Sequence, residues 1–509
     1  MEDSIGELLC YRECVSPAQS IYLLLCLVPS LVLSSSSNAD RSIGCAMSHH
    51  RQEEHAILRE SDAKDWFYKG EGAANLVLGY SGSSPSLVGK VLRIQKSARQ
   101  INLSENGCLV LSDEERLIWG GVDELVKSTS KEAAARAFVQ CVMTNYLDSK
   151  HIDPGACLFQ FHIPIPVSKE FLEAVEMNIN SQRPTWRVAA SNIDNLCGSA
   201  LLISDHSIIS GAPKSDFCFA VEIKPKCGFL PSSEYIAEAN SIKKHVTRFK
   251  MHQFLKLHQG EVSQVSGYDP LDLFSGTRDR MLLAITALFT SPQNNFRIFM
   301  NGSLIYGGLG GGADNNSVLS PKTENAIADL IAASGLQLVS LLELTAEILL
   351  RSEILHRLLA TQKMDILDIE GAIHLYYNII SQPCSVCKNL SKAEVLHKYS
   401  SLHSLPLEKS LKIVGDYLIA ATAKDCSLMI SFRPSEDGHS ASNHDTVFSK
   451  SINQSYDYKA YYIDLDLKPL KKMIYYYQLD QKIVNFYKMN QEIQGKVCCS
   501  GNGAPTAKH

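Results

Sequence analysis

The chain has 509 residues, more than one hydrophobic core usually encloses, so two lobes are expected. Hydrophobic residues make up 45% and charged residues 20%, which excludes a disordered, collagen-like or coiled-coil protein as a description of the whole chain. The net charge of −5 excludes a surface built throughout to coat nucleic acid, so any polyanion site must be local.

The 15 cysteines are scattered and odd in number, and a chain this long does not need disulfides to fold. We therefore expect reduced thiols and a location in the cytoplasm, the nucleus or both. No nucleic-acid or membrane partner is expected, and the protein is predicted to be a monomer.

Residues 1–61 are predicted to form an N-terminal extension that is disordered or dispensable. Residues 21–33 form an apolar run of signal-peptide length, but Pro29 interrupts it and acidic residues such as Glu2, Asp3 and Glu7 precede it, the wrong sign for a secretory segment. A start at Met47, which would remove this run, is the preferred alternative to a functional signal.

The predicted smaller lobe, residues 62–205, is rich in β-structure. From Asp65 the pattern is strand, glycine turn and strand, and the stretch LVGKVLRIQK (87–96) continues it. Residues 112–149 have apolar residues at helical spacing. TWRVAAS (185–191) is predicted to be a strand, and ALLISDHSII (200–209) is predicted to connect the lobes.

The predicted larger lobe, residues 206–490, mixes helices with a few strands, which makes the fold class α+β. It opens with the buried strand FCFAVEIKP (217–225). Residues 321–380 are mostly helical, and a helix over 407–423 precedes the strand SLMISF (427–432). A glycine-rich stretch at 307–317 is predicted to be a flexible loop, and residues 491–509 a disordered tail.

The first candidate site is the glycine turn. Gly70, Gly72, Ala73 and Asn75 would let backbone N–H groups approach phosphates, although a plain hairpin turn is an equal alternative. Arg93 on the next strand could bring a cation to the same phosphates.

The second candidate follows the buried strand. Glu222, Lys224 and Lys226 alternate and therefore share one face, where three charges need partners or a polyanion. A solvated sheet edge is the alternative. In the helix after it, Arg248 and Lys256 recur with His252 at intervals of four, a stripe that is either solvated or directed at an anion.

The third candidate is near the C-terminus. Pro469 suits a first helical position, and Lys468, Lys472 and Tyr476 then form one cationic flank. Asp464, where a strand ends before this helix, is placed to bind Mg²⁺. A surface carboxylate is the alternative.

His374, Cys384, Cys387 and His403 place a CxxC pair between two histidines, a set that zinc favours in tetrahedral geometry. With no open ligand position, such a zinc would brace the helical insert near 320–405. His397 is a competing fourth ligand.

The blocks EIKPKCGFLP (222–231), VTRFKMHQFLKLHQ (246–259), YDPLDLFSG (268–276) and SPQNNFRIFMNGSLI (291–305) resemble the plant inositol-pentakisphosphate 2-kinases. The resemblance covers roughly residues 62–487. It implies a kinase-like two-lobed fold with ATP bound between the lobes, dependence on Mg²⁺, and phosphorylation of the 2-hydroxyl of inositol 1,3,4,5,6-pentakisphosphate to give inositol hexakisphosphate.

The resemblance also implies residue roles. Asp425, at the end of a predicted helix, matches the catalytic aspartate, Asp464 the metal ligand, and the His/Cys quartet a structural zinc site. Nucleotide-binding roles fall to Gly70, Gly72, Ala73, Asn75, Arg93, Asp205, His206, Glu222, Lys224 and Arg297. Substrate-binding roles fall to Arg99, Arg187, Lys226, Arg248, His252, Lys256, Asn294, Asn295, Lys468, Lys472 and Tyr476, and the division of the basic residues between the two ligands stays open.

The main alternative is a non-catalytic protein that binds inositol phosphates or RNA and contains a structural zinc. It would not need Asp425 or Asp464, and it would favour aromatic residues interleaved among the basic ones. The absence of HRD and DFG motifs counts against a protein kinase.

Overall fold

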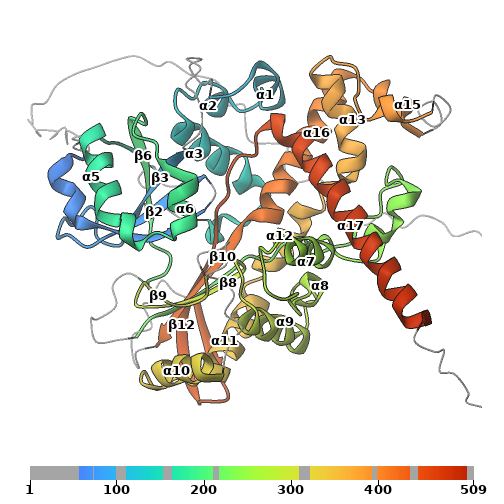
Figure 1. Ribbon diagram of the computed structural model, residues 1–509. Coiled ribbons are helices and arrows are strands. Elements are labelled where there is room, and N and C mark those ends of the chain that lie inside the picture. Colours follow the sequence, from blue (N-terminus) through green and yellow to red (C-terminus); the bar gives the residue numbers. More distant parts are fainter. Residues whose placement is uncertain are drawn as a thin grey trace, which may run out of the picture. The chain divides into compact units, whose positions relative to one another are not determined.

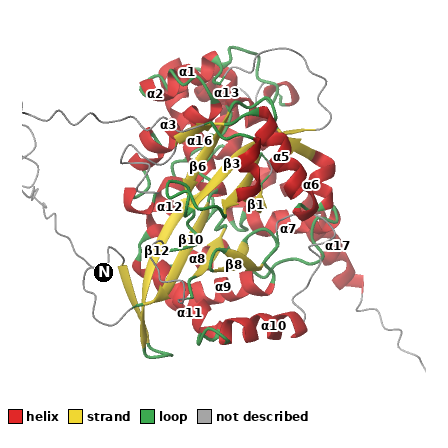
Figure 2. Ribbon diagram, turned by 90° about the vertical axis from the view of Figure 1, so that its left-hand side faces the viewer, coloured by secondary structure: helices red, strands yellow, loops and turns green. Residues whose placement is uncertain are grey.

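The computed structural model describes residues 57–72, 74–98, 110–152, 163–209, 217–308, 321–391, 398–435 and 445–500. All of them belong to one compact unit, His55–His509. They form two antiparallel sheets accompanied by many helices (Figures 1 and 2), which confirms the α+β class. The predicted boundary at residues 205 and 206 falls between the last strand of the first sheet and the first strand of the second.

The first sheet has the strand order β1-β2-β3-β6-β4, with β5 paired to the far end of β3. Alternate residues of these strands face a core that the helix α5 covers (Figure 1), for example Leu76 and Leu78 on β2 with Leu92 and Ile94 on β3. The strands are β1 (Trp66–Glu71), β2 (Asn75–Tyr80), β3 (Lys90–Ala98), β4 (Ile163–Pro166), β5 (Ser191–Ile193) and β6 (Ser199–Ser204).

The second sheet has the order β11-β12-β10-β7-β8-β9. All five residues of β7 are buried, as expected for a central strand that is covered on both faces. The predicted strands at 217–225 and 427–432 are confirmed as β7 and β10. The strands are β7 (Phe219–Ile223), β8 (Phe296–Met300), β9 (Ser303–Tyr306), β10 (Ser427–Pro434), β11 (Asp445–Ser449) and β12 (Gln454–Ile463).

The helices before the second sheet begin at residues that suit helix starts. Ser112 and Ser168 cap α1 and α5 by accepting hydrogen bonds from backbone N–H groups. These helices are α1 (Asp113–Ile118), α2 (Asp123–Val126), α3 (Lys131–Cys141), α5 (Lys169–Ile179) and α6 (Thr185–Ala190), with short 3-10 turns at Glu60–Asp65, Met143–Asn145, Ser149–His151 and Asn180–Gln182.

Most of the later helices pack with the second sheet into the largest of the hydrophobic cores, and two of them also form a smaller core with each other. They confirm the predicted helical content of residues 321–380 and 407–423. They are α7 (Arg248–His258), α8 (Pro270–Leu273), α9 (Arg278–Thr290), α10 (Pro321–Ala332), α11 (Leu338–Arg351), α12 (Ile354–Gln362), α13 (Asp368–Ile379), α15 (Ser400–His403), α16 (Leu407–Asp425) and α17 (Met473–Ser500), with 3-10 turns at Glu238–Lys244, Cys387–Asn389 and Leu470–Lys472.

The structure differs from three expectations. TWRVAAS is not a strand: Thr185–Ala190 forms α6 after Pro184, so the β-propensity of tryptophan and valine is overridden by a proline-led helix start. Pro469 precedes a 3-10 turn rather than occupying a first helical position, and α17 extends to Ser500, beyond the boundary predicted at residue 490.

Residues 1–56 and most of the predicted loop at 307–317 lie outside the described residues. Of the helices that the structure describes, none is long and apolar enough to cross a membrane.

A buried ion cluster stabilises the glycine turn. The Glu71 side chain is fully buried and accepts two hydrogen bonds from Arg183, at 2.9 and 3.1 Å, and one from Lys96 at 2.5 Å. Lys96 also donates to the carbonyl of Gly72. One carboxylate therefore pairs with two buried cations and ties β1 to β3 and to the segment before α6.

Replacing Glu71 with alanine would leave buried Lys96 without its counter-ion and buried Arg183 with only the more distant Glu176, at 3.8 Å. We expect Glu71→Ala to lower the free energy of unfolding by about 3–5 kcal/mol, measured by chemical denaturation. The matched control is Glu173→Ala, which removes an exposed pair with Lys169 and should change stability by no more than about 0.5 kcal/mol. Equal effects of the two changes would contradict this assignment.

Candidate functional site

The Asp425 carboxylate lies among three lysine ammonium groups. Its oxygens are 2.7 Å from Lys468 Nζ, 3.6 Å from Lys224 Nζ and 3.7 Å from Lys226 Nζ. The sheet explains this arrangement, because Ile223 at the end of β7 pairs with Leu428 near the start of β10. The segments after β7 and before β10 therefore meet at one edge of the sheet.

The charges in this group strongly perturb one another. Burial acts to raise the pKa of Asp425, but Lys226, Lys224 and Lys468 hold it well below its ordinary value, so the group is a carboxylate. Burial, with Lys224 adding repulsion, lowers the pKa of Lys226 to about 7. Lys226 also has a positive φ of 63°, an uncommon conformation for a residue other than glycine.

An acidic pair lies beside this group. Ile463, the last residue of β12, pairs with Ser427 of β10, which brings Asp464 next to Asp425's segment. Arg93 from β3 in the first sheet donates to Asp466 at 2.6 Å and lies 3.8 Å from Asp464. Burial, together with Asp466 and Glu222, raises the pKa of Asp464.

These two carboxylates fit a hard cation. Magnesium is usually held by one or two carboxylates together with substrate phosphates, and Asp464 and Asp466 can supply the two carboxylates. Asp464 has a φ of 61°, so its backbone is held in a sparsely populated conformation at this point. Asp466, which had not been singled out, belongs to the site, and the alternation in DLDL could have indicated it.

Glu222 and Arg297 form a second ion pair on this sheet. They face each other across β7 and β8, with Arg297 Nη1 2.7 Å from Glu222 Oε2. Arg297 also donates through Nε to the carbonyl of Gly308 at 3.0 Å. The backbone N–H of Lys224 donates to the carbonyl of Asn295, which fixes the lysine segment to the start of β8.

A cavity of about 690 Å³ brings together three of the predicted substrate-binding residues. Arg187 enters from α6, Lys256 from α7, and Asn294 from the turn before β8. Trp186, whose ring stacks with the Arg187 guanidinium at 4.1 Å, also lines it and was missed by sequence analysis. Among the described residues, the buried Oδ1 atoms of Asn294 and Asn295 have no hydrogen-bond donor.

The predicted stripe of Arg248, His252 and Lys256 lies on the helix α7. Thr247 caps the helix by accepting a hydrogen bond from Lys250 N–H, so the stripe starts in the first turn at Arg248. Burial and the neighbouring cations Arg248, Lys256 and Lys226 lower the pKa of His252 to about 3, which keeps this histidine neutral. Besides burial, Arg248 and Lys256 also lower the pKa of Lys226, so the stripe lies near the lysines that surround Asp425.

The glycine turn is a closed hairpin, in which Gly72 N–H donates to the Asn75 carbonyl at 2.8 Å. At the predicted hinge, Asp205 pairs with Lys69, which sequence analysis had not identified. His206 packs against Tyr461, with ring centroids 4.1 Å apart.

The remaining predicted residues differ in placement. Burial and the nearby Asp425 raise the pKa of Tyr476 to about 12. Lys472 is exposed, in the 3-10 turn before α17. Ala73 and Arg99 lie outside the described residues.

The predicted His/Cys quartet comes together. His374 Nδ1 lies 3.5 Å from both Cys384 Sγ and Cys387 Sγ and 3.1 Å from His403 Nε2, and Cys387 Sγ is 3.2 Å from His403 Nε2. All four ligand atoms lie within 4.8 Å of one another. His397, the competing ligand, lies outside the described residues.

This geometry fits zinc. Tetrahedral bonds of about 2.0 Å to nitrogen and 2.3 Å to sulfur separate the ligand atoms by about 3.3–3.8 Å, close to the distances found. His403 Nδ1 lies 3.1 Å from Asn378 Oδ1, so the amide oxygen can orient the imidazole as carbonyl oxygens do in metal sites. No ligand position is left open, which indicates a structural site.

Comparisons with known proteins decide the family. A model of the family described as "Inositol-pentakisphosphate 2-kinase" matches residues 68–482. The chain belongs to the inositol-pentakisphosphate 2-kinase family. This confirms the resemblance seen in the sequence blocks around Glu222, Arg248, Tyr268 and Ser291.

Several members of the inositol-pentakisphosphate 2-kinase family align along most of their length. The chain is 57% identical to inositol-pentakisphosphate 2-kinase IPK1 of Oryza sativa subsp. indica over 439 residues, which cover 86% of this chain and 97% of the relative. It is 48% identical to the Arabidopsis thaliana protein, covering 88% and 99%. A Danio rerio relative is 27% identical, covering 84% and 94%.

Proposed function

We propose that this protein transfers the terminal phosphoryl group of ATP to the 2-hydroxyl of inositol 1,3,4,5,6-pentakisphosphate, giving inositol hexakisphosphate. Membership of the family supports this activity. The observation that carries the proposal is the placement of Asp425 among Lys224, Lys226 and Lys468, beside the acidic pair Asp464 and Asp466.

The basic residues suit a polyanionic acceptor. One cation and one phosphate charge at about 4 Å interact by roughly 1–4 kcal/mol for effective dielectric constants between about 80 and 20, before desolvation, so several contacts are needed. The cavity supplies Arg187 and Lys256, and the neighbouring cluster supplies Lys226 and Arg248. We assign these residues to the acceptor.

Asp425 would then orient the attacking hydroxyl and accept its proton. In the protein without substrate, three ammonium groups satisfy this carboxylate and its pKa is low. When phosphates engage the lysines, the carboxylate loses part of that stabilisation and becomes a better acceptor for the hydroxyl proton. Substrate binding thereby prepares the base.

The donor would lie between the two sheets. We assign the ATP phosphates to the glycine turn, Lys224 and Arg93, and the adenine to the Asp205 and His206 segment. A magnesium ion held by Asp464 and Asp466 would neutralise charge on the transferring phosphates. Arg93 contacts both carboxylates in this structure, and it would be free to bind the phosphates if Asp464 and Asp466 held magnesium.

Asp425→Asn should lower kcat by about 10²- to 10⁴-fold, because the amide cannot accept the hydroxyl proton. The assay is transfer from Mg-ATP to the pentakisphosphate, resolved by anion-exchange chromatography, with and without residues 1–46. The control is Asp416→Asn on the same helix. Asp416 pairs with the exposed Lys412, and this variant should keep the wild-type activity. A folded wild-type protein that binds ATP but forms no hexakisphosphate would refute the proposed acceptor.

The lowered pKa of Lys226 predicts that binding of the inositol phosphate depends on pH. Its ammonium has a pKa of about 7 in the free protein, and a bound polyanion favours the charged form and raises that pKa. Affinity for inositol hexakisphosphate should therefore fall above pH 7, by up to about tenfold per pH unit, as binding requires proton uptake. Calorimetry from pH 6.5 to 9 would measure this slope.

The matched variant is Lys226→Arg, since arginine stays charged across this range. It should remove the Lys226 contribution to the slope and leave only the titration of the ligand phosphates. Equal slopes for wild type and variant would contradict the assignment.

We propose that the His/Cys quartet binds zinc as a brace. Metal analysis should find about one zinc per chain. Cys387→Ser should abolish that content and lower the melting temperature, whereas Cys141→Ser, which changes a cysteine outside the quartet, should preserve both. Full zinc content in Cys387→Ser would refute zinc binding by the quartet.

The non-catalytic alternative is not supported, because the relatives carry kinase names. We keep the cytoplasm, the nucleus or both as the proposed location, since none of the described cysteines forms a disulfide. A monomer remains our expectation.

A further inference from the structure

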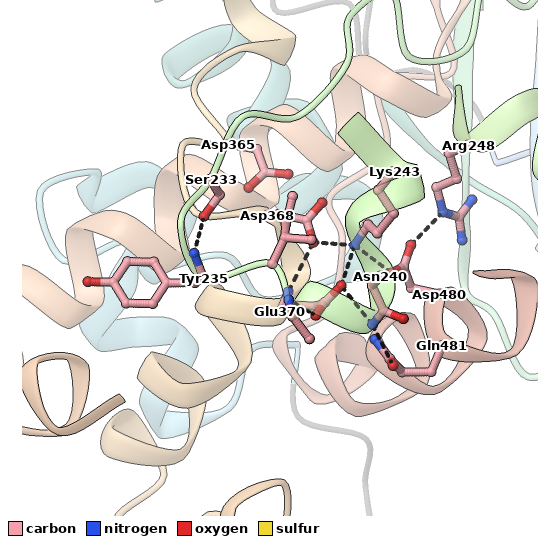
Figure 3. A network of polar contacts seen from close by, with 12 residues as sticks. Ser233, Tyr235, Asn240, Lys243, Arg248, Asp365, Asp368, Glu370, Asp480 and Gln481 are labelled. Atoms are coloured by element: carbon pink, nitrogen blue, oxygen red, sulfur yellow. Dashed lines mark hydrogen bonds and ion pairs between the residues drawn. The ribbon is translucent and has the colours of Figure 1, made fainter. Parts of the chain in front are cut away.

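A buried polar network lies behind the basic stripe of α7 (Figure 3). Lys243, only 4% exposed at its side chain, donates to three carboxylates: Asp368 at 2.5 Å, Glu370 at 3.0 Å and Asp480 at 2.7 Å. An ammonium has three N–H donors, so all are used. The three carboxylates resemble a cation site, but the lysine ammonium already fills it.

The network has more negative than positive charge. Three carboxylates surround one ammonium, and burial of an unpaired charge is costly, so further cations nearby stabilise the network. Arg248 is one of them: Nε of Arg248 lies 3.3 Å from Asp480 Oδ1. Figure 3 shows Asp480 between Lys243 and Arg248, so one carboxylate serves the buried ammonium with Oδ2 and the guanidinium with Oδ1.

This contact uses only one of the five N–H groups of Arg248. The side chain is 43% exposed, whereas the Asp480 side chain is 4% exposed. Among the described residues, the two terminal nitrogens of Arg248 make no hydrogen bond. A guanidinium held through Nε offers its terminal nitrogens as a fork, the geometry that binds a phosphate with two parallel hydrogen bonds.

Arg248 is close to the reaction centre. Its charge contributes to the lowered pKa values of Lys226 and His252, and Lys226 lies 3.7 Å from Asp425. The terminal nitrogens of Arg248 are thus part of the cationic cluster to which we assign the acceptor, while its Nε belongs to the buried network.

We propose that Asp480, anchored by Lys243, is a positioning residue that turns the terminal nitrogens of Arg248 toward a phosphate of the acceptor. This inference rests on the proposed function, because it takes a polyphosphate as the ligand. Asp480 does not touch the substrate and acts only through Arg248. Glu370 supports the anchor from α13, since it also accepts hydrogen bonds from Asn240 and from the backbone of Ala237.

The test is a double-mutant cycle on binding of inositol hexakisphosphate, measured by calorimetry on the full chain. Asp480→Asn should weaken binding about tenfold in the wild-type background. In the Arg248→Ala background the same change should have little further effect, because the residue through which it acts is gone. The KM for ATP should stay within about twofold throughout.

The matched control is Asp272→Asn. Asp272 also accepts a hydrogen bond from the Nε of a partly exposed arginine, Arg280, at 2.8 Å, but that pair lies outside the proposed site. Asp272→Asn should leave the binding of inositol hexakisphosphate unchanged. Equal losses from Asp480→Asn with and without Arg248 would show a merely structural role and overturn the proposal.

A second variant covers the case in which Asp480→Asn does not fold. Arg248→Lys keeps the charge on a half-exposed residue but cannot hold Asp480 and offer a fork at once. It should weaken binding about as much as Asp480→Asn, and wild-type affinity would overturn the proposal. Because the readout is binding, a protein that binds the hexakisphosphate but transfers no phosphoryl group would refute the proposed activity and still test the positioning role.

Discussion

The crowding of like charges around Asp425 is the constraint on which the rest of the site depends. Lys224, Lys226 and Lys468 must remain close together before any polyanion arrives, although each repels the others. The Asp425 carboxylate offsets part of this repulsion. A pKa of about 7 for Lys226 and a neutral His252 offset more of it, because fewer positive charges are present at once.

The sheet, rather than the side chains, provides the rigidity that this crowding requires. The ends of β7, β10 and β12 are fixed by antiparallel pairing, and the residues just beyond them carry the functional groups. Lys226 and Asp464, both at such ends, have positive φ angles of 63° and 61°. Such conformations cost of order 1–3 kcal/mol each, so the surrounding structure must impose them.

Local pattern was enough to predict the parts of the site that lie on regular elements or in sequence blocks. The buried strand before Glu222, the stripe at Arg248 and the His/Cys quartet all follow from spacing or ligand chemistry. Asp425 was different, because its position suggested only a helix terminus and its proposed role came from the family resemblance. Lys69 and Trp186 were missed, since Lys69 is defined by a partner more than 100 residues away and Trp186 by a cavity. Asp466 was also missed, although the alternation in DLDL could have indicated it.

The same limit explains why the network around Lys243 could not be predicted. Its carboxylates come from α13 and α17, and only the fold brings Asp480 to a lysine more than 200 residues earlier. The network also has a consequence for the quartet. Glu370 and His374 lie one turn apart on α13, so the helix that supports the Lys243 anchor also carries a member of the quartet. A zinc ion held by the quartet would thus affect substrate binding by keeping α13, and through it Lys243, Asp480 and Arg248, in one arrangement.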